Sequence, residues 1–198
     1  MKKHICLFFL LSVISFSTFS QEKDDYFLYR DSVFHFQFKY PRNYSLKHVY
    51  NQFLLISKIS NDSIFCDIDI RISDFLFQND KKETFMDFVE RHSSSMFDAD
   101  GPDESFHGEY IASIKYLKNK LNIDFIEIYE LVSYMNLKLK GNLKTVSTHG
   151  PVFYFDLSSK NLDKGVVFRL FYKNWKTPNN DKDSELILRQ IIDSFEFI

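Results

Sequence analysis

Glycine, proline and cysteine are scarce in this sequence. Among 198 residues there are five glycines, four prolines and two cysteines. Scattered glycines build neither a phosphate-binding loop nor a dinucleotide-binding fingerprint, because both need closely spaced glycines before a helix. The Gly-x-Ser-x-Gly sequence of a nucleophile elbow is also missing. These absences exclude nucleotide-binding proteins of those two kinds and hydrolases built on that elbow, and the sequence identifies no catalytic residue.

The spacings that bind metals are missing as well. The histidines after residue 20 include no pair four residues apart, and no two cysteines lie close together in the sequence. Zinc sites on helices and in zinc fingers depend on those spacings. The sequence therefore predicts no metal site and no cofactor.

Charge of one sign is not concentrated anywhere in the chain. The net charge is −2, and the charged residues form no block of a single sign. Proteins that bind nucleic acid present a basic face to the phosphates. We therefore expect no nucleic-acid partner.

The first twenty residues have the pattern of a secretory signal peptide. Lys2 and Lys3 precede an apolar run, Ile5–Val13, and small residues follow it at Thr18 and Ser20. A basic start, a short apolar core and small residues at the cleavage site are typical of such a peptide. The run is too short to cross a bilayer as a helix, which takes roughly 20 residues. We expect cleavage after Ser20, no transmembrane anchor afterwards, and a periplasmic or secreted protein.

Only one cysteine remains in the mature chain that this cleavage produces. Cys6 is removed with the signal peptide, and Cys66 is left without a partner for an internal disulfide. Cys66 alternates with isoleucines, so we expect it on a buried apolar face, where a thiol is unreactive.

Aromatic residues are abundant, and many alternate with polar residues. The chain has 23 phenylalanines and 11 tyrosines. In the run Val33–Tyr40 every second residue is aromatic, which is typical of a half-buried strand that ends at Pro41. Further strands are expected near Tyr44, over 52–60 and 63–73, and as a meander over 122–172. Asn61-Asp62 and Gly141-Asn142 are expected as hairpin turns, and Gly150-Pro151 as a break between strands.

Two segments have the spacing of amphipathic helices. In the first, 82–97, the apolar residues and a histidine recur every three or four positions, and the helix is expected to start at Asp80 or Lys81. The second follows Asp181 or Asp183 and is expected to bury Leu186, Ile187, Ile191 and Phe195, with Arg189 on its solvent side. The segment 105–117 fits either a helix or a strand. Strands joined by turns, together with two separate helices, predict a single α+β domain over residues 21–198: an antiparallel sheet covered by helices.

Both ends of the mature chain resemble one known family. The stretch Phe34–Tyr44, with its alternating aromatics and Tyr40-Pro41, is similar to the first strands of the PsbP-like proteins, which are relatives of an extrinsic photosystem II subunit. The closing segment Leu186–Phe197 resembles the last helix of the same family. The resemblance implies an α/β/α sandwich and an accessory or binding protein without catalysis. It implies no catalytic residues.

A small group of charged residues is the best candidate for a binding site. Asp67, Asp69 and Arg71 alternate along the expected strand 63–73 and share one face, and His35 is a possible neighbour. This face is expected to be solvated. We expect an exported, non-enzymatic accessory protein that binds a protein or small ligand of the cell envelope. The alternatives are an extracytoplasmic hydrolase whose site is assembled from these distant residues, and an envelope subunit that functions by assembly.

Overall fold

The computed structural model describes most of residues 21–198. The described residues are 25–50, 53–59, 67–78, 81–99, 105–136, 143–170 and 182–198. The predicted signal peptide, Cys66 and the two expected turns Asn61-Asp62 and Gly141-Asn142 lie outside them.

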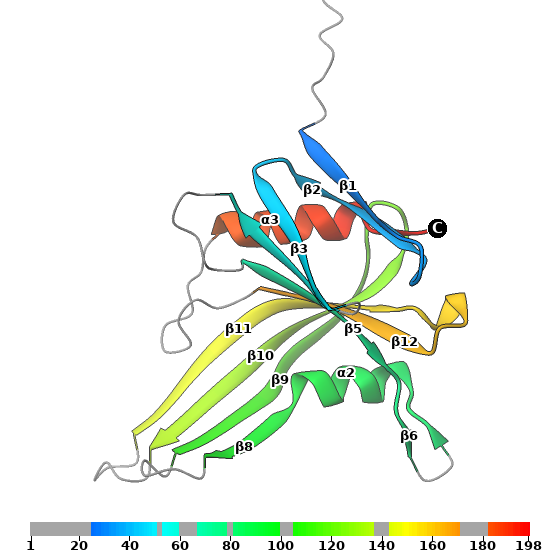
Figure 1. Ribbon diagram of the computed structural model, residues 1–198. Helices are drawn as coiled ribbons and strands as arrows, with labels where there is room; N and C mark the ends of the chain where they lie inside the picture. Colours follow the sequence, from blue (N-terminus) through cyan, green and yellow to red (C-terminus); the bar gives the residue numbers. More distant parts are fainter. Residues whose placement is uncertain are drawn as a thin grey trace, which may run out of the picture.

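An eight-stranded sheet forms the centre of the molecule (Figure 1). All of its strand pairings are antiparallel. In the order in which they lie side by side, the strands are β3 (Tyr44–Tyr50), β4 (Phe53–Lys58), β5 (Ile68–Asp74), β12 (Lys164–Leu170), β11 (Leu143–Asp156), β10 (Asp124–Asn136), β9 (Ser105–Lys118) and β8 (Ser95–Ala99).

The two helices cover opposite faces of this sheet. Helix α2 (Phe85–Ser93) lies on one face, and helix α3 (Lys182–Ser194) lies on the other together with a small second sheet (Figure 1). The second sheet has the order β1 (Tyr26–Asp31), β2 (Phe36–Pro41) and β13 (Glu196–Phe197). A short hairpin, β6 (Phe77–Gln78) and β7 (Lys81–Lys82), and a 3-10 turn, η1 (Ser158–Lys160), complete the described elements. The fold is therefore α+β, as predicted.

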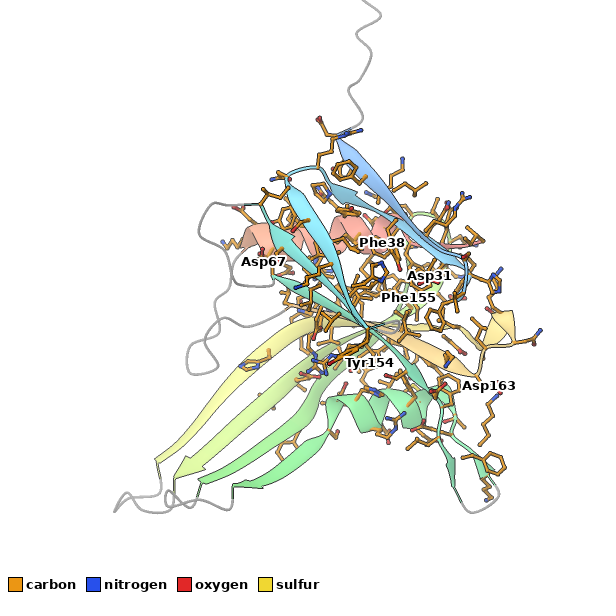
Figure 2. All side chains as sticks on the ribbon, viewed as in Figure 1. Asp31, Phe38, Asp67, Tyr154, Phe155 and Asp163 are labelled. Atoms are coloured by element: carbon orange, nitrogen blue, oxygen red, sulfur yellow. The ribbon has the colours of Figure 1, made fainter. Side chains whose placement is uncertain are left out.

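The core on the α3 side is largely aromatic. Phe38, Phe155, Phe168 and Phe195 are fully buried there, and the Phe195 ring lies 4.1 Å from that of Phe155. Figure 2 shows Phe38 and Phe155 on this side of the sheet and Tyr154 on the other. The aromatic alternation in 33–40 correctly predicted which face is buried.

The first part of that run is a turn, which corrects the predicted start of the strand. Asp31 Oδ1 accepts hydrogen bonds from the backbone N–H groups of Val33 and Phe34, both at 2.9 Å. Residues 32–35 therefore form a turn, and strand β2 begins at Phe36. An aspartate that binds the backbone two or three residues later competes with strand pairing, so the turn is favoured over an earlier start.

Helix α2 is shorter than its apolar spacing predicted. Thr84 forms a capping box with Asp87, so the helix starts at Phe85 rather than near Asp80. The helix ends at Ser93, and Met96 belongs to strand β8. Apolar residues near Met96 fit both helical spacing and strand alternation, which is why the apolar spacing predicted a helix that continues into the strand.

The structure decides one open alternative and corrects one expected break between strands. The ambiguous stretch 105–117 is strand β9, paired along its length with β10. Gly150-Pro151 does not end a strand, because β11 continues through it to Asp156. The register between β10 and β11 shifts between Ile128 and Glu130, so the extra residue is accommodated as a bulge.

The buried stripe of helix α3 agrees with the predicted one at Ile187, which is partly buried, and at Ile191, but not at Leu186. Leu186 is exposed, whereas Leu188, Ile191 and Ile192 are buried. Phe195 is fully buried, as predicted, although it lies just after the helix. The prediction placed Arg189 in solvent, but this residue binds a buried carboxylate described below.

Candidate binding site

Asp67 and Asp69 are buried, which corrects the predicted solvated face. Their exposed fractions are 7% and 1%. Strand β5 lies inside the eight-stranded sheet, where β4 and β12 pair with its two edges. Alternation shows which residues share a face, but it does not show whether that face is covered.

Asp69 forms a close ion pair with Arg71, two residues further along β5. Asp69 Oδ2 accepts hydrogen bonds from Arg71 Nε at 3.1 Å and from Arg71 Nη2 at 2.8 Å. Asp69 Oδ1 is buried and has no hydrogen-bond partner among the described residues. Half of the Arg71 side chain is exposed, so the guanidinium covers the carboxylate at the protein surface. Within this carboxylate, one oxygen is bound by a half-exposed cation, and the other is a buried acceptor with no partner among the described residues.

The neighbouring strands extend this pair into a larger network. Arg169 of β12 lies opposite Asp69 in the strand register. Its Nη2 donates to Glu130 Oε1 at 3.1 Å and to the backbone oxygen of His92, in the last turn of α2, at 3.2 Å. Glu130 is buried. We call Asp69, Arg71, Arg169 and Glu130 the β5–β12 cluster.

The sequence analysis missed two members of this cluster. Glu130 lies in the mostly apolar and aromatic stretch Phe125–Val132, which also contains Glu127, and Arg169 is the single charge in the stretch Val166–Leu170. A single charge within a buried strand is rarely tolerated without a partner. That isolation was the available signal, but the pairing across three strands requires the register.

The environment of Asp69 perturbs its titration. Burial raises the pKa of the Asp69 carboxyl, and the positive charges of Arg71 and Arg169 partly oppose this rise. A carboxyl perturbed by burial and by specific charges is a typical feature of functional sites, although structural ion pairs show it as well.

Two rows of residues place exposed side chains beside the cluster. Residues directly opposite one another on neighbouring strands share a face of the sheet. Lys47 pairs with Leu55, and Leu55 pairs with Asp69. The register of β3 shifts at a bulge between His48 and Tyr50, and beyond it Tyr50 pairs with Phe53, which pairs with Arg71. Lys47 and Tyr50 are both exposed, and Tyr50 retains 75% of its accessible surface. The site therefore continues from Asp69 to the edge strand β3.

His35 is not part of this site. It lies in the turn between β1 and β2, in the second sheet, with a positive φ of 56°. Its backbone oxygen accepts a hydrogen bond from the N–H of Ile198 at 3.0 Å. The structure thus brings Asp69 and Arg71 together, places Asp67 two residues before Asp69 on the same segment, and puts His35 in a different sheet.

A second ionic cluster lies on the α3 face. Glu127 of β10 is buried and binds Lys115 Nζ at 2.9 Å and Arg189 Nη1 at 2.7 Å. Arg189 Nη2 also donates to the hydroxyl of Tyr129 at 3.2 Å. Burial opposes ionisation of Glu127, but the bonds to Lys115 and Arg189 outweigh it and lower the pKa of this carboxyl. The cluster joins α3 to the sheet and holds its carboxylate ionised.

A pocket of about 270 Å³ lies beside the β1–β2 turn. Its lining includes Tyr29, Asp31 and His48. Both oxygens of Asp31 are engaged, because Oδ1 binds the turn and Oδ2 accepts a hydrogen bond from the Tyr29 hydroxyl at 2.9 Å. Burial and the neighbouring Asp31 raise the pKa of Tyr29. The pocket is close to the lower limit of ligand-binding cavities, which begin at about 300 Å³, and its acid already stabilises the turn.

The described residues contain neither a metal-binding group nor a membrane-spanning helix. In that part of the chain, no three residues among His, Cys, Asp and Glu are grouped so that they could hold a metal ion. Neither described helix has the length and apolar character needed to cross a membrane.

Solved structures that resemble this chain include two with low identity and low TM-scores. No protein-family model and no curated protein matches the chain. The solution structure of the cyanobacterial PsbP protein (CyanoP) from Synechocystis sp. PCC 6803 is similar, with 16% identity and a TM-score of 0.44 over 88% of this chain and 93% of that one. A crystal structure from Bacteroides thetaiotaomicron VPI-5482 has 9% identity and a TM-score of 0.29 over 86% of this chain and 48% of that one. The first is a PsbP protein, as the sequence resemblance suggested. Likenesses this weak concern the arrangement of strands and helices and assign no residue a role.

Proposed function

We propose that the mature chain is an exported accessory protein that acts by binding a protein or small ligand of the cell envelope, and that the β5–β12 cluster is its binding site. Export is supported by the signal-peptide pattern of residues 1–20. An accessory role is supported by the PsbP-like sequence at both ends of the mature chain.

The main observation in favour of this binding site is the incomplete hydrogen bonding of the Asp69 carboxylate. Its Oδ1 atom is buried without a hydrogen-bond partner, while the half-exposed Arg71 covers the same carboxylate. Leaving a buried acceptor unsatisfied costs about 1–3 kcal/mol. A ligand that donates a hydrogen bond to Oδ1 removes this cost, so the bound state is favoured by a defect already present in the free protein.

Cross-linking from the exposed rim of the cluster tests this proposal. A photo-reactive residue at Lys47, which shares the Asp69 face, is expected to form discrete adducts in the cell envelope. The same residue at Lys118, exposed on the distant strand β9, is the control. We expect the position-47 adducts to disappear in the double variant Asp69→Asn, Arg71→Gln. Adducts that persist unchanged in that variant would place the binding site elsewhere.

One observation favours a second candidate function, a hydrolase. The raised pKa of the Asp69 carboxyl is what an acid–base catalyst requires. A screen of the mature protein against esterase, phosphatase, peptidase and glycosidase substrates separates the two candidates. Activity that Asp69→Asn abolishes while the fold is retained would favour the hydrolase. An inactive protein that still forms the position-47 adducts would favour the binding function.

A further inference from the structure

We infer that the ligand of the β5–β12 cluster is a carbohydrate, with a sugar ring stacked on Tyr50 and sugar hydroxyls bound to Arg71 and Asp69. This inference rests on the proposed binding function and specifies its ligand. It comes from three side chains that the strand register places on one face of β3, β4 and β5.

The hydrogen-bonding chemistry of the cluster suits hydroxyl groups. Asp69 Oδ1 needs a donor, and the Arg71 guanidinium carries only donors and therefore binds acceptors. A hydroxyl is both a donor and an acceptor. Neighbouring hydroxyls of one sugar can accordingly donate to Asp69 and accept from Arg71. A simple cation would be repelled by Arg71 and Arg169, and a simple anion would leave Asp69 Oδ1 without its donor.

Tyr50 supplies the apolar half of such a site. Its side chain is three-quarters exposed at the edge strand, in the row that leads through Phe53 to Arg71. An exposed aromatic ring offers a flat apolar face, and the C–H face of a sugar ring can pack against it. Two strand spacings separate Tyr50 from Arg71, or about 10 Å between backbones. This distance allows a sugar ring on the tyrosine and hydroxyl groups beside the arginine.

The path to Asp69 runs past Arg71. Asp69 is 1% exposed in the free protein, so a ligand reaches Oδ1 only when side chains around the carboxylate move. Arg71 is the exposed partner of the pair, and its long side chain crosses to Asp69 from two residues away. Movement of the guanidinium toward a sugar hydroxyl would open the carboxylate to the same ligand. Lys47, exposed in the Asp69 row, adds a further donor at the rim.

The test is binding of the mature protein to an array of neutral and acidic oligosaccharides, followed by calorimetric titration with each sugar that binds. We expect at least one sugar to bind, and Tyr50→Ala to weaken its affinity about tenfold or more. Asp69→Asn and Arg71→Gln should have a similar effect. Tyr116→Ala is the matched control, because Tyr116 is 70% exposed but lies on the distant strand β9, and it should leave the affinity unchanged.

Each other outcome contradicts the inference in a distinguishable way. If no sugar on the array binds, or if Tyr50→Ala binds like the unaltered protein, the carbohydrate inference fails. Cross-linking at position 47 then decides about the broader proposal: adducts that depend on Asp69 and Arg71 retain the binding function without a sugar, and absent adducts remove both. Tyr50 is exposed, so its alanine variant remains a valid test even if Asp69→Asn does not fold.

Discussion

Two buried carboxylates on opposite faces of the sheet titrate in opposite directions. Glu127 is stabilised in its ionised form by Lys115 and Arg189, whereas burial of Asp69 outweighs the effect of its arginines. Their side chains differ in only one respect that matters here: Glu127 has a cation bound to each oxygen, and Asp69 has one bare oxygen. Stability should therefore depend on pH in different ways at the two sites.

The first prediction concerns Glu127. Because its folded-state pKa is lowered from the ordinary 4.5, its contribution to stability is complete above that value and is lost as pH falls through the folded pKa. We expect Glu127→Gln to reduce the free energy of unfolding by about 1–3 kcal/mol at pH 7. The difference from the unaltered protein should shrink as the pH falls below 4.5 in urea-unfolding measurements. A difference that stays constant with pH would show that the ion pairs do not contribute.

Asp69 should show the reverse dependence. Its pKa is raised from 3.8, so its contribution is complete below that value and is lost as pH rises through the folded pKa. As the pH rises from 4 to 7, the free energy of unfolding of Asp69→Asn should therefore increase relative to that of the unaltered protein. Urea unfolding at several pH values measures this. A trend in the opposite direction would mean that Arg71 and Arg169 outweigh burial.

At the scale of elements, an aromatic residue in or next to each helix packs closely against the sheet. Phe88 of α2 lies against Gly165 of β12, where an added Cβ would approach the Phe88 ring to 2.5 Å. On the other face, Phe195 directly follows α3 and its ring lies against Phe36, Phe155 and Phe168. Both contacts lie in close-packed cores, so a change of a few atoms should be measurable.

The contact between α2 and the sheet leads to the third prediction. Gly165→Ala inserts a methyl group against a buried ring, and overpacking of this kind costs typically 1–3 kcal/mol. The variant should melt at a lower temperature than the unaltered protein. Adding Phe88→Leu should recover part of the loss, because the leucine side chain vacates the space beside position 165. If the double variant is less stable by the sum of both single effects, the two positions do not compete for space.

The fourth prediction concerns α3. Phe195→Ala removes a fully buried ring and should cost about 3–5 kcal/mol. Leu186→Ala, on the exposed side of the same helix, should change stability by no more than about 0.5 kcal/mol. Thermal unfolding of both variants measures the contrast. Equally small effects would show that the end of the chain is only loosely packed.

At the scale of the whole molecule, one aromatic core joins the two sheets and α3. Residues from β2, β5, β11, β12 and α3 all contribute to it, so segments near both ends of the mature chain meet in the centre. The termini of the mature domain are therefore part of one packed unit. Removal of the predicted signal peptide, residues 1–20, would therefore delete no residue of this packed unit.

The fifth prediction is the cleavage itself. The exported protein should begin at Gln21, because Thr18 and Ser20 supply the small residues at the cleavage site. Intact-mass measurement of the protein recovered from the cell envelope or the medium decides this. A mature protein that retained Cys6 would contradict the prediction.

Local patterns determined much of the architecture. The alternation in 33–40 identified the buried aromatic face, because period-two spacing follows directly from the geometry of a strand. The helix limits were less predictable, since Thr84 and its capping partner outweighed the apolar spacing. The same sequence evidence also favoured the α+β class that the structure shows.

The sequence predicted only part of the candidate site. Asp67, Asp69 and Arg71 were found because they alternate along one strand. Their burial, the partnership of Asp69 with Arg169 across strands, and the separation of His35 were decided by the tertiary structure alone. Periodicity reports which residues share a face, whereas the cover on that face and the register between strands depend on contacts between segments far apart in the chain.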